Sequence, residues 1–111
     1  MIEQVIDVVF DNADKAHVQH LATTSFAKHD ALSEFYTGVR EALDTLVESA
    51  IGLDIPAPDE DNDLVTELEA GMIELSQMRE GFCQENPTLL NQFDELTACY
   101  TKVLFKLKRL K

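Results

Sequence analysis

Apolar residues recur over the first two dozen positions with the three-and-four spacing of a single helical face. They are Ile2, Val5, Ile6, Val9, Ala13, Ala16 and Leu21. The polar triplet Thr23-Thr24-Ser25 interrupts this pattern, and hydroxyl side chains of this kind favour a helix cap over a helix interior. The pattern predicts a helix over residues 2–22 that ends in a short turn.

A second stripe predicts a helix over residues 25–52. Its members are Leu32, Tyr36, Val39, Leu43, Leu46, Val47 and Ala50. Ser25 or Thr24 is expected to cap its start. Gly52 lies just past the last apolar position, where a C-terminal glycine cap belongs.

Residues 53–62 contain Pro56 and Pro58, which prevent a helix and favour an extended course. At about 3.1–3.3 Å per residue such a segment spans roughly 30 Å, about the length of a helical bundle. The linker can therefore act as a crossover between parallel helices. A plain up-down-up-down bundle also fits.

Two further helices are predicted after the linker. Asp61, Asn62 or Asp63 can cap the third, which runs to about Phe82. The pair Asn86-Pro87 marks the start of the fourth, with Asn as N-cap and Pro at the first helical position. This helix ends in cations, which suit the negative end of a helix dipole. They are Lys106, Lys108, Arg109 and Lys111.

Four amphipathic helices predict an all-α fold, a four-helix bundle in a single domain over residues 1–111. The net charge of −12 argues against nucleic-acid binding, because such a surface repels phosphates. No apolar run approaches the roughly 20 residues of a membrane span, and no signal peptide precedes the first helix. Cys83 and Cys99 match no metal or disulfide pattern, so we expect reduced thiols in a cytoplasmic protein.

All the histidines, His17, His20 and His29, flank the first turn. If the turn is centred near residue 23, His17 and His29 lie at the same level of an antiparallel hairpin. Facing imidazoles are the start of a metal site, although ordinary polar residues near a helix end fit equally well. His20 is either an auxiliary ligand or a hydrogen-bonded helix-end residue, and the second interpretation is favoured.

The second predicted helix also carries an acid pair, Asp44 and Glu48, spaced i, i+4 on one face. A sector of roughly 100° beside the apolar stripe collects these acids with polar neighbours. The neighbours are His29, Ser33, Thr37 and Arg40. Such a sector is either a surface for a partner or a solvated flank.

His29 and Asp44 are 15 residues apart, which is about 22 Å along a helix. They can share a metal ion only if a second copy of the helix packs antiparallel across a two-fold axis. The axis must then cross near Thr37 and Gly38, which are small enough for close approach, with Arg40 beside them. This geometry predicts an isologous dimer with two equivalent sites.

The spacing of His17, His29, Asp44 and Glu48 resembles that of the Dps-type miniferritins, a branch of the ferritin-like superfamily. The segment SFAKHDALSEFYTGVREALDTLVESAIG is similar to the second helix of that family throughout. The resemblance implies a ferritin-like bundle in which two histidines of one subunit and two acids of its two-fold mate bind iron. It also implies a ferroxidase activity that oxidises Fe(II) with peroxide or oxygen.

The chain departs from the pattern of that family at Ser33, where the family has a carboxylate four residues after the second histidine. Glu34 is nearby but points about 100° away from that position. We therefore expect iron or another divalent metal such as zinc or manganese, bound by a homo-oligomer that is at least a dimer. The alternative is a non-enzymatic dimeric interaction module that kept the fold and lost the iron chemistry. A histidine phosphotransfer bundle is disfavoured, because no Lys-Gly pair follows a histidine.

Overall fold

The computed structural model describes residues 1–109, and within them all regular structure is helical. Four α-helices and one short 3₁₀ turn follow in the order α1, Ile2–Ala22; α2, Phe26–Gly52; α3, Leu64–Cys83; η1, Pro87–Leu89; and α4, Leu90–Arg109. The all-α prediction is therefore confirmed, and each predicted helix is present within a few residues of its expected bounds. None of the described helices has the length and apolar character needed to cross a membrane.

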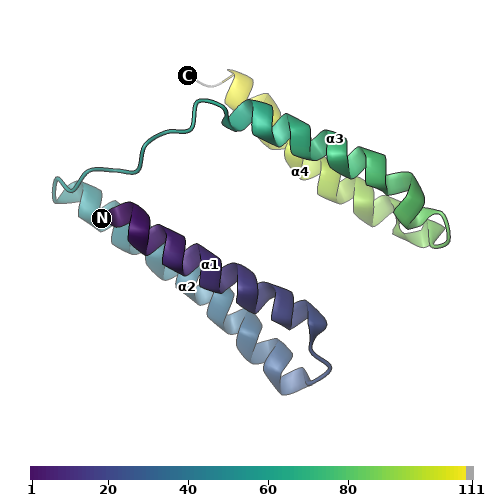
Figure 1. Cartoon of the computed structure of the whole chain (residues 1–111), viewed down its shortest axis with the longest axis horizontal. Coiled ribbons are helices and arrows are strands. Elements are labelled where there is room, and N and C mark those ends of the chain that lie inside the picture. The colour runs from purple at the N-terminus through teal and green to yellow at the C-terminus, as the bar shows by residue number, and fades with distance from the viewer. Residues whose placement is uncertain (110–111) are drawn as a thin grey trace. The chain divides into compact units, whose positions relative to one another are not determined.

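The helices form two compact units, residues 1–59 and residues 60–111. In the first, which we call the first hairpin, α1 and α2 run antiparallel side by side (Figure 1). In the second hairpin, α3 and α4 do the same, joined through η1. The ferritin-like crossover and the single domain over residues 1–111 stay predictions.

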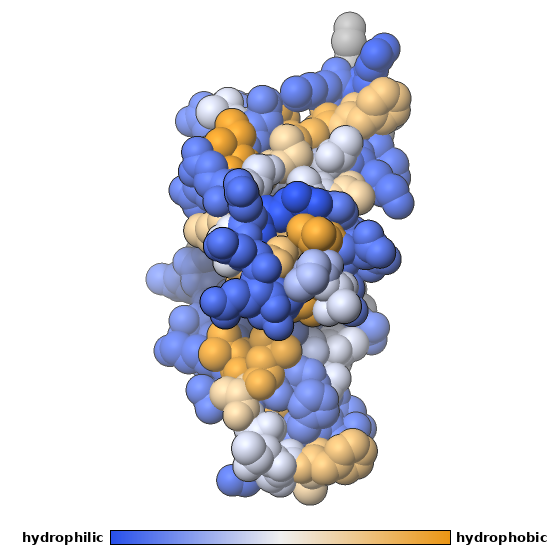
Figure 2. Space-filling model, turned by 90° about the vertical axis from the view of Figure 1, so that its right-hand side faces the viewer, coloured by the Kyte–Doolittle hydropathy of each residue, from blue (hydrophilic) through white to orange (hydrophobic). Residues whose placement is uncertain are grey.

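The core of each hairpin is thin. The buried apolar residues are Ile2, Ala13, Ala16, Leu43 and Ala50 in the first hairpin and Cys83 and Leu104 in the second. Alanines make up three of the five residues in the first set. Many larger apolar side chains are exposed between polar ones, as the orange areas of Figure 2 show.

The helix ends confirm most predicted caps and correct one. Ser25 caps α2, and its hydroxyl accepts a hydrogen bond from the Lys28 N–H at 3.3 Å. Gly52 was expected to form a glycine cap at the end of α2, but it is the last helical residue and Leu53 is the C-cap. The left-handed residue is Asp54, with a φ of 66°, a conformation that aspartate tolerates.

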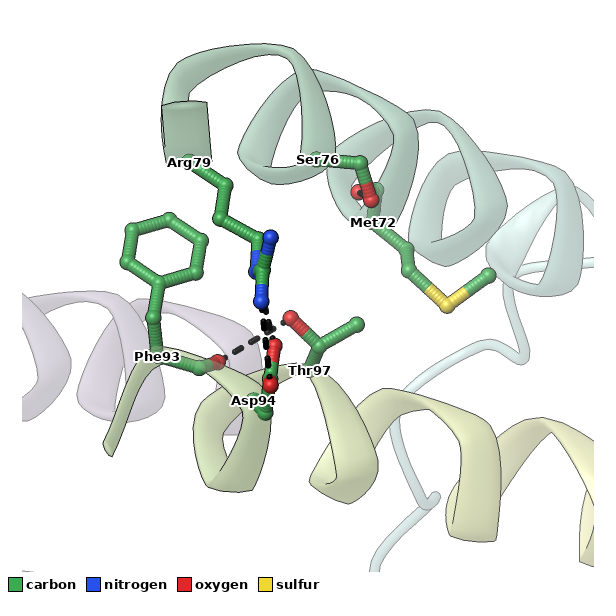
Figure 3. A network of polar contacts seen from close by, with 6 residues as sticks. All are labelled: Met72, Ser76, Arg79, Phe93, Asp94 and Thr97. Carbon is green, nitrogen blue, oxygen red and sulfur yellow. Dashed lines mark hydrogen bonds and ion pairs between the residues drawn. The ribbon is translucent and has the colours of Figure 1, made fainter. Parts of the chain in front are cut away.

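In the second hairpin, Asp63 is the N-cap of α3, and the Asp61 carboxylate accepts its N–H at 2.9 Å. Asn86 and Pro87 start η1, which leads into α4. A bidentate ion pair joins α3 to α4 near this turn, with Arg79 Nε and Nη2 donating to Asp94 at 2.8 and 3.1 Å (Figure 3). The hydrogen bonds to Asp94 raise the pKa of the Arg79 guanidinium, so this link holds across the physiological pH range.

Candidate functional site

The turn between α1 and α2 positions the histidines. Thr23 and Ser25 adopt extended backbone conformations, and the Thr23 hydroxyl accepts the Ser25 N–H at 3.2 Å. The chain therefore reverses within three residues, which brings the last turn of α1 beside the first turn of α2. His20 and His29 occupy these two turns.

Four aromatic rings gather at this end of the first hairpin. His20 stacks on His29 with ring centroids 3.6 Å apart, and His17 stacks on Tyr36 at 4.0 Å. His20 also meets the edges of His17 and Tyr36, at 6.0 and 5.5 Å. Every histidine of the chain thus belongs to one ring cluster, which we call the histidine cluster.

Two reciprocal hydrogen bonds tie the stacked pair to the backbone. His20 Nδ1 lies 2.7 Å from the His29 carbonyl oxygen, and His29 Nδ1 lies 2.8 Å from the His20 carbonyl oxygen. A carbonyl oxygen only accepts, so each Nδ1 must carry a hydrogen and donate it. The His20 carbonyl belongs to the last turn of α1, where helical partners are lacking, so His29 also caps that helix.

The pairing of the rings differs from the predicted one. A turn centred on residue 23 placed His17 level with His29, whereas His29 stacks on His20, one helical turn further along α1. His17 instead faces Tyr36. The extended residues of the turn shift the register of the two helices. The favoured interpretation of His20, a hydrogen-bonded residue at a helix end, is confirmed.

The predicted acid ligands lie far from the histidine cluster, on the C-terminal half of α2. Asp44 and Glu48 are exposed, and they line a hollow of the first hairpin. Its other walls are Ile6, Phe10, Leu43, Val47 and Pro58. The i, i+4 spacing places both carboxylates on one face, as predicted.

The residues between histidines and acids divide into two groups. Arg40, expected at a dimer interface, forms an ion pair with Asp14 of α1 inside the hairpin. Thr37 and Gly38 are exposed, and a Cβ added to Gly38 would meet no atom within 4 Å. The middle of α2 therefore presents an open surface at the position where the predicted two-fold axis crosses.

Of the remaining candidates, Ser33 is half-buried and Glu34 is exposed. Within the described residues of one chain, no three His, Cys, Asp or Glu side chains form a group that could hold a metal ion. The histidine cluster offers nitrogen atoms without carboxylates, and the α2 acids offer carboxylates without nitrogen.

The fold and this cluster define an all-α protein built from two helical hairpins, with its histidines gathered at one turn. Residues 20–107 match a family of unknown function, DUF5856, and the chain belongs to this family. No curated protein matches the sequence, and no solved structure matches it. The matched segment includes His20, His29, Asp44 and Glu48 and begins after His17.

Proposed function

We propose that this protein binds a divalent metal ion, iron first of all, at sites shared between two copies of its first hairpin. His17 and His29 of one copy supply nitrogen ligands, and Asp44 and Glu48 of the other supply carboxylate oxygens. The proposal is supported by the resemblance of these four residues to the Dps-type miniferritin pattern and by the exposure of His29, Asp44 and Glu48 along α2, with His17 half-buried on α1.

The open surface around Gly38 is the observation that carries the proposal. His29 and Asp44 are about 22 Å apart along the helix, so one chain cannot bring them together. Gly38 lies between them, is exposed, and leaves room for the close approach of a second helix. An interior glycine costs about 1 kcal/mol relative to alanine, which a contact with a second copy of α2 would offset.

The donor set suits a borderline or hard divalent cation. Imidazole nitrogen suits iron, zinc and copper, and carboxylate oxygen suits iron, manganese and magnesium, so a mixed set favours iron. In a ferroxidase, Fe(II) is the substrate and is oxidised by peroxide or oxygen. Ser33 provides a hydroxyl where the miniferritin pattern has a carboxylate, so we expect weaker iron binding than a full carboxylate set would give.

Association through α2 also has an electrostatic consequence. Antiparallel helices that cross near residues 37 and 38 place Glu34 of one copy opposite Glu41 of the other. Both side chains are exposed, and like charges in this position repel. Bound cations reduce this repulsion, so we expect divalent metal to stabilise the dimer.

A titration with Fe(II) under nitrogen, and with Zn(II) and Mn(II), tests the proposal. One site per chain is expected, with native mass spectrometry showing a metal-bound dimer. The variant His29→Ala with Glu48→Ala should lose binding, whereas Glu74→Ala, an exposed acid of α3, should not. Absence of binding at micromolar metal would refute the proposal.

Mixing two deficient variants tests the sharing of sites. One variant carries His17→Ala and His29→Ala, and the other carries Asp44→Ala and Glu48→Ala. Neither binds metal alone, but a mixed dimer holds one intact site, so an equimolar mixture should regain about a quarter of the wild-type sites. No recovery in a mixture that forms mixed dimers would show that the four residues do not act together.

A second candidate is the metal-free interaction module. Its support is the surface: twenty large apolar side chains of the described residues are exposed, among them Phe26 at 83% and Val8 at 60%. Val8 belongs to a contiguous apolar groove of the first hairpin with Val5, Leu46 and Ile55, and contiguous apolar patches mark interaction sites. A dimer that forms without metal, and whose stability a chelator leaves unchanged, would favour this candidate.

A further inference from the structure

We infer that His20 is a positioning residue for His29, which it holds in the Nδ1–H tautomer with Nε2 free to bind a metal ion. The inference rests on the proposed function for the metal, but the tautomer itself is a property of the metal-free chain. His20 stacks on His29 and meets His17, the other proposed nitrogen ligand, only edge-on. It acts through the ring that it stacks on.

The hydrogen bonds determine the tautomer. His29 Nδ1 donates to the His20 carbonyl oxygen at 2.8 Å, so in the neutral ring Nε2 has no hydrogen and carries the lone pair. Free imidazole side chains favour the opposite tautomer, with hydrogen on Nε2. Metal-binding histidines commonly donate the second ring nitrogen to a carbonyl or carboxylate, which fixes the tautomer and orients the ring.

Burial separates the roles of the two rings. His20 is half-buried and touches His17 and Tyr36 by their edges, so neighbouring rings hold it in place. His29 is exposed and has the stacked ring of His20 on one face, 3.6 Å away. Within the stacked pair, His29 is therefore the ring more open to a metal ion, and His20 is the ring that supports it.

The second hydrogen bond of the stacked pair holds the His20 ring in place. His20 Nδ1 donates to the His29 carbonyl oxygen at 2.7 Å, so the ring of His20 is tied to the helix that carries His29. Loss of the His20 side chain removes this bond and the stack, while its backbone carbonyl is kept. The ring of His29 then gains rotamer freedom, and binding must order it again.

Long-range proton–nitrogen NMR spectra of the metal-free protein, at a pH where imidazoles are neutral, test the inference. In the wild type, His29 should show the Nδ1–H pattern. In His20→Ala the share of the Nε2–H pattern should rise, because the less ordered His29 ring meets the retained carbonyl of residue 20 less often, and Zn(II) affinity should fall by about 10-fold to 100-fold, the usual effect of losing an outer-shell partner. His20→Phe keeps the stack without the donor, so its affinity should lie between the two.

Asp14→Asn is the matched control, because it weakens the Arg40 ion pair between the same helices without touching an imidazole. It should leave the tautomer and the affinity unchanged. An Nε2–H pattern in wild-type His29, or an unchanged tautomer and affinity in His20→Ala, would overturn the inference. The Nδ1–H pattern in a protein that binds no metal would overturn the proposed function and uphold the role of His20 in fixing its neighbour.

Discussion

The two hairpins of this chain have the same architecture and are closed by different chemistry. Near its turn, the second hairpin uses a bidentate ion pair between Arg79 and Asp94, a contact found on many protein surfaces. The first hairpin uses stacked imidazoles and hydrogen bonds from their rings to backbone carbonyls. Either device joins two helices, but only the imidazole stack of the first hairpin brings ring nitrogen atoms together.

Charge separates the hairpins as well. Residues 1–59 contain three Lys and Arg against eleven Asp and Glu, whereas residues 60–111 contain six against ten. Most cations of the second hairpin gather in the last turns of α4, where they favour the helix dipole and where Lys108 pairs with Glu69. The first hairpin therefore has the greater attraction for metal cations.

The largest expected effect is the loss of stability when a buried leucine of either hairpin is truncated. Among residues 1–109, the buried leucines are Leu43 and Leu104, at 4% and 5% exposure. Replacement of either by alanine leaves a cavity and should lower the free energy of unfolding by about 2–3 kcal/mol. Urea denaturation, monitored by circular dichroism, measures the free energy of unfolding of both variants.

The shape of these transitions tests the predicted single domain. If residues 1–111 unfold as one unit, both variants shift one cooperative transition by similar amounts. If each variant shifts only one of two separate transitions, the hairpins are independent and the single-domain prediction is wrong.

Helix positions were predictable because each helix has its own apolar stripe, and a stripe depends only on local spacing. The bounds of α1 and the Ser25 cap followed from such local signals. The last residue of α2 also followed, but its C-terminal cap did not, because Asp54 takes the left-handed position that Gly52 was expected to favour.

The histidine cluster was predictable in its members and not in its pairing. Three histidines around one turn had to lie close together, whatever the turn. Which rings stack depends on the backbone conformation of Thr23 and Ser25, and a shift of one helical turn exchanges His17 for His20. Tyr36 was assigned to the core from its stripe, and its stacking on His17 had no signal in the sequence.

Two glycines provide the next comparison. Gly38 in α2 and Gly81 in α3 are both exposed, and a Cβ at either would meet no atom within 4 Å. Alanine at either position should therefore raise the stability of the separate chain by about 0.5–1 kcal/mol, through helix propensity. Gly38→Ala should in addition weaken the metal-bound dimer, whereas Gly81→Ala should leave it unchanged.

Sedimentation velocity with metal present measures the fraction of dimer. Thermal unfolding at low protein concentration measures the stability of the separate chain. A dimer that tolerates Gly38→Ala, and also the larger Gly38→Leu, would show that α2 does not meet its copy at this point. The proposed shared site would then lose its geometric basis.

A smaller effect comes from the ion pairs. Arg79→Lys removes a bidentate fork, and Arg40→Lys keeps a single contact to Asp14. Both sites are at least one-third exposed, so the first change should cost about 0.5 kcal/mol and the second less. Denaturant midpoints at low salt and at 0.5 M salt measure which of the two substitutions costs more stability. Equal costs would show that the fork geometry adds nothing to the closure of the second hairpin.

The smallest expected effect concerns the start of α3. A hydrogen bond with Asp61 raises the pKa of Glu67, and the negative charges of Asp61 and Asp63 raise it further. The folded state therefore binds more protons than the unfolded state at pH values between the ordinary pKa of 4.5 and the raised one. In this window stability falls as the pH rises.

Glu67→Gln removes the titrating group and keeps a hydrogen-bonding side chain. The variant should be slightly more stable than the wild type at pH 7, and the advantage should vanish near pH 4, where wild-type Glu67 is protonated. Urea midpoints at both pH values measure the difference, with Glu74→Gln as a control on the same helix. An advantage of equal size at both pH values would assign the effect to helix propensity instead of the carboxylate cluster, since propensity does not depend on the protonation of Asp61 and Glu67.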